Sequence, residues 1–359
     1  MSAWLRRWRA WAAAAGVAAL LAVVLLLPLP AFVESPGSVV TLGGCVDVHA
    51  EDAVPVRGDF LLTSVALVRA TPATAALASL REDQRVRAED RVVRRDVPDA
   101  EHFDGQRRVF ARSAQSAAAL GLRAAGFGAD PERLVGDGAV VTGVLDGAPA
   151  EGVLRRGDVI VGVDGAAIRT DAELRALLDD TDEVEVRFTR DGRPREVTIT
   201  PVELVVDGEE RVILGVRLET LNARVDLPVP VDVTSGRIGG PSAGLMIALA
   251  VYDQSDPTVD LAAGRRVAGT GTLTSQGAVG RVGGIGLKAL AAAERRADVF
   301  LAPASQAEEA AALLPAGTGL EVVAVTTFED AVQTLLDTAE PGESYGPPSD
   351  PQCPLRPAA

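Results

Sequence analysis

The N-terminal end of the chain is a short basic segment followed by a long apolar run. Residues 1–9 read MSAWLRRWR, and residues 10–27 are 18 uncharged residues. As a helix with a rise of about 1.5 Å per residue, this run is about 27 Å long, which just spans a bilayer core. The sequence that follows, PLPAFVESPG, offers no clean cleavage site, so an uncleaved anchor is favoured over a removed signal peptide. Residues 10–31 are therefore predicted to form one transmembrane helix.

The charges around this run predict its orientation. Arg6, Arg7 and Arg9 favour a cytoplasmic location for residues 1–9, which places the rest of the chain outside the cytoplasm. In that compartment the two cysteines, Cys45 and Cys353, could form one disulfide, but the sequence leaves their pairing open. A net charge of −15 with no visible basic patch argues against nucleic acid as a partner.

The remaining chain divides by pattern into four parts. Residues 32–128 contain β-type segments, a charged stretch and an Ala-rich helix, and are predicted to be a connecting region. Residues 129–204 contain short strands and turns, including a hairpin centred on Asp191-Gly192 and a helix capped by Thr170. Residues 205–340 alternate strands with helices, which predicts an α/β domain. The Pro-rich residues 341–359 are predicted to be disordered.

One serine lies where a nucleophile could be exposed. In GGPSAGLMIALAV, Ser242 follows Gly-Gly-Pro and opens an apolar helix. Pro241 suits the first turn of a helix because it lacks the N–H that would go unpaired there. The free amides at this helix start could stabilise an oxyanion, and the candidates are Gly240, Pro241 and Ala243. A simple helix-start role for Ser242 remains the alternative.

A single lysine could serve as the base. Of 35 basic residues, Lys288 is the one lysine, and it starts the helix KALAAAERR among apolar neighbours. Burial and a helix N-terminus both disfavour the ammonium form and lower the pKa of a lysine, whereas arginine cannot act as a base. The alternative is a lysine on a surface helix. A Ser-His-Asp triad is not indicated, because neither His49 nor His102 lies in a supporting motif.

The segment AEGVLRRGDVIVGVDG resembles the core of a PDZ domain. The resemblance covers about 65 residues and implies a β-rich domain that binds an extended peptide by strand addition. The carboxylate-binding loop that many PDZ domains carry is not placed, so the peptide-binding residues stay open.

Two further motifs resemble those of the Lon-type serine protease domain. They are GGPSAGL at 239–245 and TGTLTSQGAVGRVGGIGLK at 270–288. The resemblance implies a Ser-Lys dyad of Ser242 and Lys288, with Thr270 supporting the lysine amine. It also implies ring-forming hexamers. Many Lon proteases have Asp where this chain has Gly239, and the ATPase module of Lon is not found in this sequence.

These observations predict an α/β (α+β) Lon-type domain with a small PDZ domain, preceded by a transmembrane helix. The predicted function is that of a membrane-anchored serine endopeptidase acting on unfolded or extended protein segments, with the PDZ domain binding or gating the substrate. No cofactor or metal is expected. The alternative is a non-catalytic PDZ scaffold with a degenerate peptidase domain, which substitution of Lys288 would distinguish.

Overall fold

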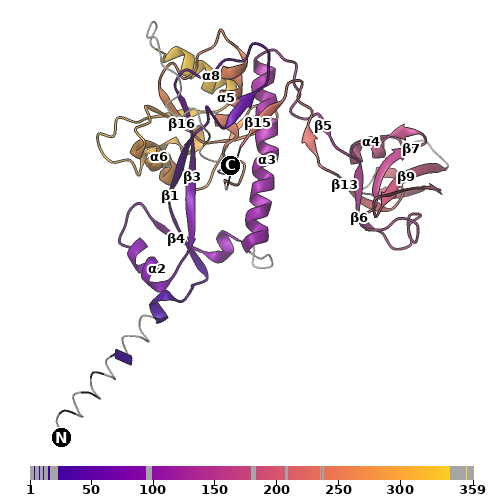
Figure 1. Ribbon diagram of the computed structural model, residues 1–359, viewed down its shortest axis with the longest axis horizontal. Coiled ribbons are helices and arrows are strands. Elements are labelled where there is room, and N and C mark those ends of the chain that lie inside the picture. The colour runs from indigo at the N-terminus through magenta and orange to yellow at the C-terminus, as the bar shows by residue number, and fades with distance from the viewer. Residues whose placement is uncertain are drawn as a thin grey trace. The chain divides into compact units, whose positions relative to one another are not determined.

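The chain forms two compact units in the computed structural model (Figure 1). The residues described are 23–93, 99–178, 183–206, 209–234 and 238–339, with Trp4, Trp8, Trp11, Ala15, Gly16, Gly236 and Cys353. The first unit consists of Met1–Ala129 and Leu227–Ala359, and the second of Asp130–Asp226. The second unit is thus an insertion in the chain of the first. Residues 32–128, expected to be a connecting region, belong to the first unit, and residues 205–226, expected in the Lon-type domain, belong to the second.

A six-stranded mixed sheet organises the first unit. The strand order is β20 (Glu321–Val325), β19 (Val299–Pro303), β16 (Arg266–Gly269), β3 (Asp59–Arg69), β1 (Ala31–Thr41) and β4 (Arg85–Ala88). The first four strands are mutually parallel, whereas β1 pairs antiparallel with both β3 and β4. Val267 of β16 pairs with Phe60 of β3, so the sheet joins segments from opposite ends of the chain. The mixed α/β character predicted from the sequence is confirmed.

Helices pack on this sheet and on each other. The helix α5 (Gly244–Ser255) is apolar on nearly all sides and almost fully buried, as expected of a helix with no polar face. The long helix α3 (Asp99–Ala124) packs along α5, and α6 (Ile285–Glu294) packs on β1 and β3. At Gly121 of α3 a Cβ atom would lie 2.6 Å from the carbonyl oxygen of Ala248, so the two helices approach closely. Further helices of this unit are α2 (Pro72–Ala78), α7 (Ala307–Ala311) and α8 (Phe328–Asp337).

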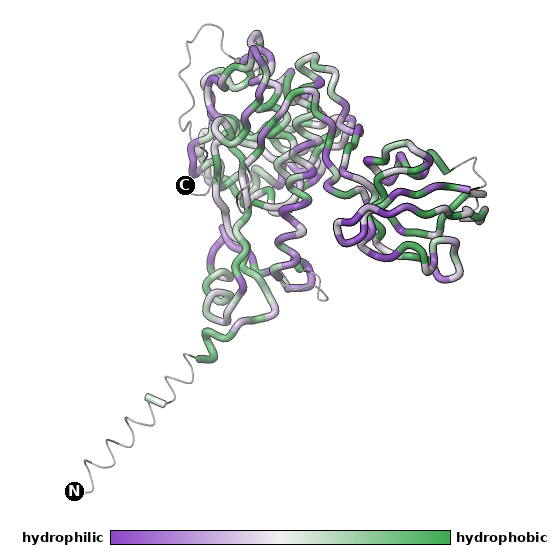
Figure 2. Tube along the Cα trace, turned by 45° about the vertical axis from the view of Figure 1, so that its right-hand side comes forward, coloured by the Kyte–Doolittle hydropathy of each residue, from purple (hydrophilic) through white to green (hydrophobic). Residues whose placement is uncertain are grey.

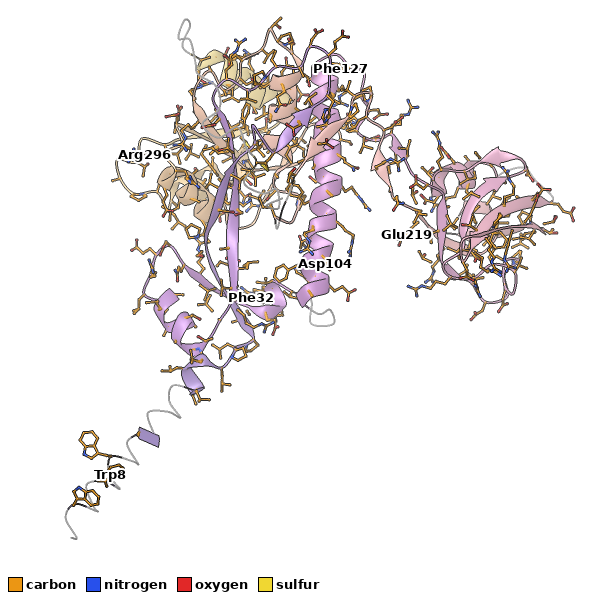
Figure 3. All side chains as sticks on the ribbon, viewed as in Figure 1. Trp8, Phe32, Asp104, Phe127, Glu219 and Arg296 are labelled. Atoms are coloured by element: carbon orange, nitrogen blue, oxygen red, sulfur yellow. A yellow bond between two sulfur atoms is a disulfide. The ribbon has the colours of Figure 1, made fainter. Side chains whose placement is uncertain are left out.

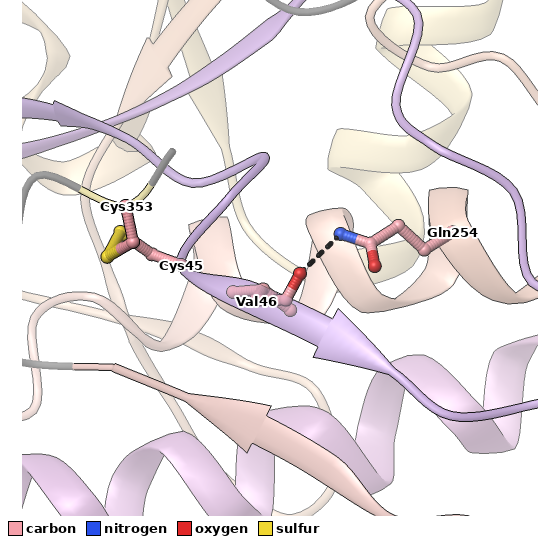
Figure 4. Close-up of a disulfide and its surroundings, with 4 residues drawn as sticks. All are labelled: Cys45, Val46, Gln254 and Cys353. Atoms are coloured by element: carbon pink, nitrogen blue, oxygen red, sulfur yellow. Dashed lines mark hydrogen bonds between the residues drawn. A yellow bond between two sulfur atoms is a disulfide. The ribbon is translucent and has the colours of Figure 1, made fainter. Parts of the chain in front are cut away.

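A short ladder and a disulfide hold the segment that leads to the serine. Strand β15 (Val231–Val233) pairs with β2 (Val46–Val48), and the Thr234 amide donates to the Cys45 carbonyl at 2.8 Å. Cys45 forms a disulfide with Cys353, a pairing that the sequence had left open (Figure 4). Beside it, the side-chain amide of Gln254 donates to the Val46 carbonyl at 3.0 Å. A further pair is β17 (Thr272–Leu273) with β18 (Val279–Gly280).

The second unit is a small β-rich domain with its own core. Its main sheet has the order β10 (Arg193–Ile199), β9 (Val184–Arg190), β7 (Val159–Val163), β6 (Ala139–Val144) and β13 (Val216–Thr220), with β8 (Ala166–Ala167) paired to β7. Asp191 and Gly192 both have positive φ and join β9 to β10, as the hairpin signal predicts. Thr170 caps α4 (Asp171–Ala176) by accepting from the Glu173 amide. The minor pairs are β11 (Val202–Val206) with β12 (Glu209–Ile213), and β5 (Leu134–Val135) with β14 (Arg224–Val225).

The predicted transmembrane helix at 10–31 falls mostly on residues that lie outside the described part of the chain. Within the described part, no helix is long and apolar enough to cross a membrane. Residues 23–27 are described, and they are apolar and exposed (Figure 2). The predicted disordered tail at 341–359 also lies outside the described residues, except for Cys353.

Candidate active site

The serine lies on a tight turn at the start of α5. Gly240 has φ +83°, a conformation that favours glycine, and Ala243 is the N-cap of the helix. The Ser242 carbonyl accepts hydrogen bonds from the Gly271 amide and from the Thr270 hydroxyl, both at 3.0 Å. The chain that leaves the end of β16 therefore holds the serine turn from one side.

Lys288 reaches the same place from the first turn of α6. This helix begins after Gly284, which adopts a left-handed conformation with φ +64°. The Lys288 Nζ atom lies 2.8 Å from Ser242 Oγ and donates to Thr270 Oγ1 at 2.9 Å. The structure thus brings together the three residues that the sequence singled out, although they are up to 46 positions apart in the chain.

The lysine amine is buried, and no carboxylate of the described residues pairs with it. Lys288 is 4% exposed, and burial lowers its pKa from 10.5 to about 8. Because a buried ammonium loses its hydration, the neutral amine gains relative to the charged form. Gly239, three residues before Ser242, adds no acid to this site. A sizeable fraction of the amine is therefore neutral, and able to accept a proton, at mildly alkaline pH.

The three predicted oxyanion candidates differ in what they can donate. Pro241 has no N–H, so its inclusion was wrong on chemical grounds. The Gly240 amide already donates to the carbonyl oxygen of Gln106 at 2.9 Å. Among the described residues no acceptor is found for the Ala243 amide, which makes Ala243 the best placed of the three.

A cleft of about 1160 Å³ opens onto Ser242 and Lys288. Residues 62–67 of β3 line one side, and α3 contributes Ala100, His102, Phe103, Asp104 (labelled in Figure 3), Gln106 and Arg107. Strand β3 pairs with β16 only over residues 59–62, and no described strand pairs with residues 64–67 on that edge. Sequence reasoning missed both walls, because the local pattern marks them as strand and helix without indicating their neighbours.

The two histidines are separated in the structure. His49 contacts Asp232 at 2.9 Å, whereas His102 lines the cleft and contacts the ring of Phe103. Within the described residues, neither histidine has a hydrogen bond to Ser242. No group of three or more His, Cys, Asp or Glu side chains that could hold a metal ion is found in the part of the chain that was searched.

Two family models match parts of this chain. Residues 119–200 match the model of the PDZ domain, and residues 217–338 match the model of the Lon protease (S16) C-terminal proteolytic domain. The chain combines a PDZ domain with a Lon-type proteolytic domain. The resemblance inferred from the sequence motifs is thereby confirmed, and the match to the proteolytic domain supports a serine peptidase. The PDZ match lies largely within the second unit.

Two of the solved structures that are similar to this chain each match less than a quarter of it. The PDZ domain of the SdrC-like protein from Listeria monocytogenes is 25% identical, with 23% of this chain and 87% of that chain covered and a TM-score of 0.21. A solution structure from Geobacillus thermodenitrificans is 30% identical, with 23% and 95% covered and a TM-score of 0.20. A search among curated proteins finds no significant match.

Proposed function

We propose that this PDZ-containing Lon-like protein is an endopeptidase in which Ser242 is the nucleophile and Lys288 is the general base. The proposal rests above all on one observation, the 2.8 Å separation of Lys288 Nζ from Ser242 Oγ at a buried site. Thr270 is assigned the role of orienting the amine, since its hydroxyl bonds both Nζ and the Ser242 carbonyl. With one N–H of the amine directed at Thr270, the lone pair is available to Ser242.

The proposed reaction proceeds through an acyl-enzyme. The neutral Lys288 amine takes the proton from Ser242 Oγ as Oγ attacks the peptide carbonyl carbon, and the Ala243 amide faces the developing oxyanion. The resulting ammonium then gives its proton to the leaving amine as the C–N bond breaks, which leaves an ester on Ser242. Lys288 then takes a proton from water as the water oxygen attacks this ester. It returns the proton to Oγ as the C–Oγ bond breaks, which releases the carboxyl product and restores the serine.

The free edge of β3 supports the proposal that the substrate binds as an extended strand. Residues 64–67 line the cleft beside Ser242 and Lys288 and have an unpaired edge among the described strands. An exposed edge can pair with an incoming peptide, whose backbone then supplies the hydrogen bonds whatever its side chains are. A folded substrate could not present such a strand, so the proposed substrates are unfolded or extended protein segments.

The chain order supports a gating role for the PDZ domain. The second unit is inserted between α3 and β15. Gln106 of α3 contacts Gly240 of the serine turn, and β15 leads along the chain into the same turn. Both connections of the PDZ domain therefore run to elements that contact or precede Ser242. We propose that peptide binding to the PDZ domain presents or gates the substrate.

The cellular setting is part of the same proposal. Residues 10–31 would anchor the chain in the cell membrane, with residues 1–9 in the cytoplasm and the two units outside it. The disulfide of Cys45 and Cys353 supports an oxidising compartment, because cytosolic thiols are kept reduced. We further propose that cleavage does not require ATP, and that the chain assembles into a ring of the Lon type.

The test is degradation of an unfolded model protein, such as casein, by the full chain in detergent micelles without nucleotide. The wild type is expected to cleave, whereas Ser242→Ala and Lys288→Arg are expected to lose at least about a thousandfold in kcat, as when catalytic residues are removed from other serine proteases. Arginine keeps the charge but cannot act as a base. The control Arg295→Lys changes an exposed residue at the end of the same helix and is expected to be fully active.

Two outcomes of this test would refute the proposal. Equal cleavage by wild type and Lys288→Arg would remove Lys288 from the mechanism. Peptide binding by the PDZ domain without any cleavage by the wild type would favour the non-catalytic scaffold instead.

A further inference from the structure

One helix contacts the serine turn at two points. The Gln106 carbonyl of α3 accepts from the Gly240 amide at 2.9 Å, and the Ser113 hydroxyl, two helical turns further along, donates to the Pro241 carbonyl at 3.3 Å. Residues 240 and 241 immediately precede Ser242. The helix therefore holds the two residues that precede Ser242, whereas Thr270 and Gly271 hold the Ser242 carbonyl.

Gly239 is small for a steric reason. Unlike Gly240, it does not have a positive φ, so other residues could adopt its backbone conformation. A Cβ atom at Gly239 would, however, lie 2.9 Å from the Cβ of Gln106 and 3.3 Å from its carbonyl carbon. Contacts shorter than about 3 Å between carbon atoms are strongly repulsive, because optimal separations are about 3.5–4.0 Å. Any side chain at 239 must displace either the turn or α3.

The helix is not free to move away. At Gly121, a Cβ would lie 2.6 Å from a carbonyl oxygen of α5 and 2.9 Å from the Cβ of Val251. This close packing ties α3 to α5, the helix that follows Ser242 in the chain. A displacement at Gly239 is therefore expected to move the serine turn rather than α3.

We infer that Gln106 is a positioning residue for the peptidase, acting through the backbone of Gly240, and that Gly239 is the small residue that lets α3 approach closely enough to do this. The inference rests on the proposed function of Ser242 and Lys288. Through its carbonyl, Gln106 would fix the turn so that Ser242 Oγ stays within hydrogen-bond distance of Lys288 Nζ.

A double-mutant cycle tests the contact in the full chain. Gly239→Ala is expected to lower kcat/KM for casein peptides at least about tenfold, because small misplacements of a nucleophile are costly. In a Gln106→Gly background the opposing Cβ is gone, so Gly239→Ala is expected to lower kcat/KM less than about threefold. Arg108→Gly is the matched control background. It introduces the same helix-weakening glycine at an exposed position of α3 that does not line the cleft. In this background Gly239→Ala should still cause its full loss of kcat/KM.

The outcomes separate the contact from general loosening of the helix. An equal loss in the wild-type and Gln106→Gly backgrounds overturns the inference. If the loss is reduced in the Arg108→Gly background as well, the inference is also overturned, because a more flexible α3 would then explain the reduction. Inactivity of the wild type itself would instead count against the proposed function.

A second measurement needs no substitution and no activity. Hydrogen exchange of the Gly240 amide in the wild type is expected to be at least about a hundredfold slower than in an unstructured peptide, because this amide donates to Gln106. Exchange near the unstructured rate would overturn the inference even if Gly239→Ala fails to fold.

Discussion

Cleavage is expected to accelerate as the pH rises through about 8, because Lys288 must lose a proton before it can act as a base. Burial lowers the pKa of this lysine from 10.5 to about 8. At about pH 7 roughly one-tenth of the amine is then neutral, and at about pH 9 roughly nine-tenths. We therefore expect kcat/KM to rise about tenfold over this interval and to level off above it.

The same shift has a consequence for stability. In the unfolded chain Lys288 regains a pKa near 10.5, so between about pH 8 and 10.5 the unfolded state binds more protons than the native state. The free energy of unfolding therefore rises with pH across this window, by about 3 kcal/mol in total, and the stabilisation is absent below about pH 8. Lys288→Met, which has no charge to bury, should show no such rise.

The assay is initial-rate hydrolysis of a fluorogenic unfolded protein between about pH 6 and 10 at constant ionic strength, with kcat/KM reporting the free enzyme. Urea unfolding of wild type and Lys288→Met over the same range measures the stability effect. A midpoint near 6.5 would assign the base to a histidine instead of Lys288. A midpoint near 10 would mean that the amine is hydrated, and would refute the argument from burial.

Three other variants test the fold. Burial raises the pKa of Asp253 from 3.8 to about 7, so between about pH 4 and 7 the native state binds more protons than the unfolded state, and the free energy of unfolding falls as pH rises. Asp253→Asn keeps an acceptor for the Leu261 amide, and urea unfolding of this variant should show a smaller fall over the same pH range. Replacing Cys45 and Cys353 by serine should lower the free energy of unfolding by about 2–4 kcal/mol and abolish the effect of dithiothreitol on Tm, and an unchanged Tm would contradict the disulfide. Gly121→Ala should lower the free energy of unfolding by about 1–3 kcal/mol, because its methyl group meets a carbonyl oxygen of α5. Helix propensity alone predicts the opposite, so a more stable variant would show that α3 and α5 are not in contact.

Short-range features were predictable from the sequence because their physics is local. The positive-φ turn at Asp191-Gly192 and the cap at Thr170 depend only on neighbouring residues. Ser242 and Lys288 could be named because each lies near the start of a helix within a distinctive motif, and because Lys288 is the one lysine in the chain. That Pro241 cannot donate to an oxyanion was also knowable from its chemistry alone.

The walls of the cleft and the order of the domains depended on contacts between distant segments. Strand β3 pairs with β16, more than 200 residues later in the chain, and nothing in either strand's pattern encodes that partner. The insertion of the PDZ domain, the disulfide between Cys45 and Cys353, and the approach of Gln106 to Gly240 follow from the same long-range packing. The sequence by itself determined which groups could react. Only the tertiary structure decided that Lys288 Nζ lies 2.8 Å from Ser242 Oγ and out of water, because burial and distance arise when separate helices pack on a common sheet.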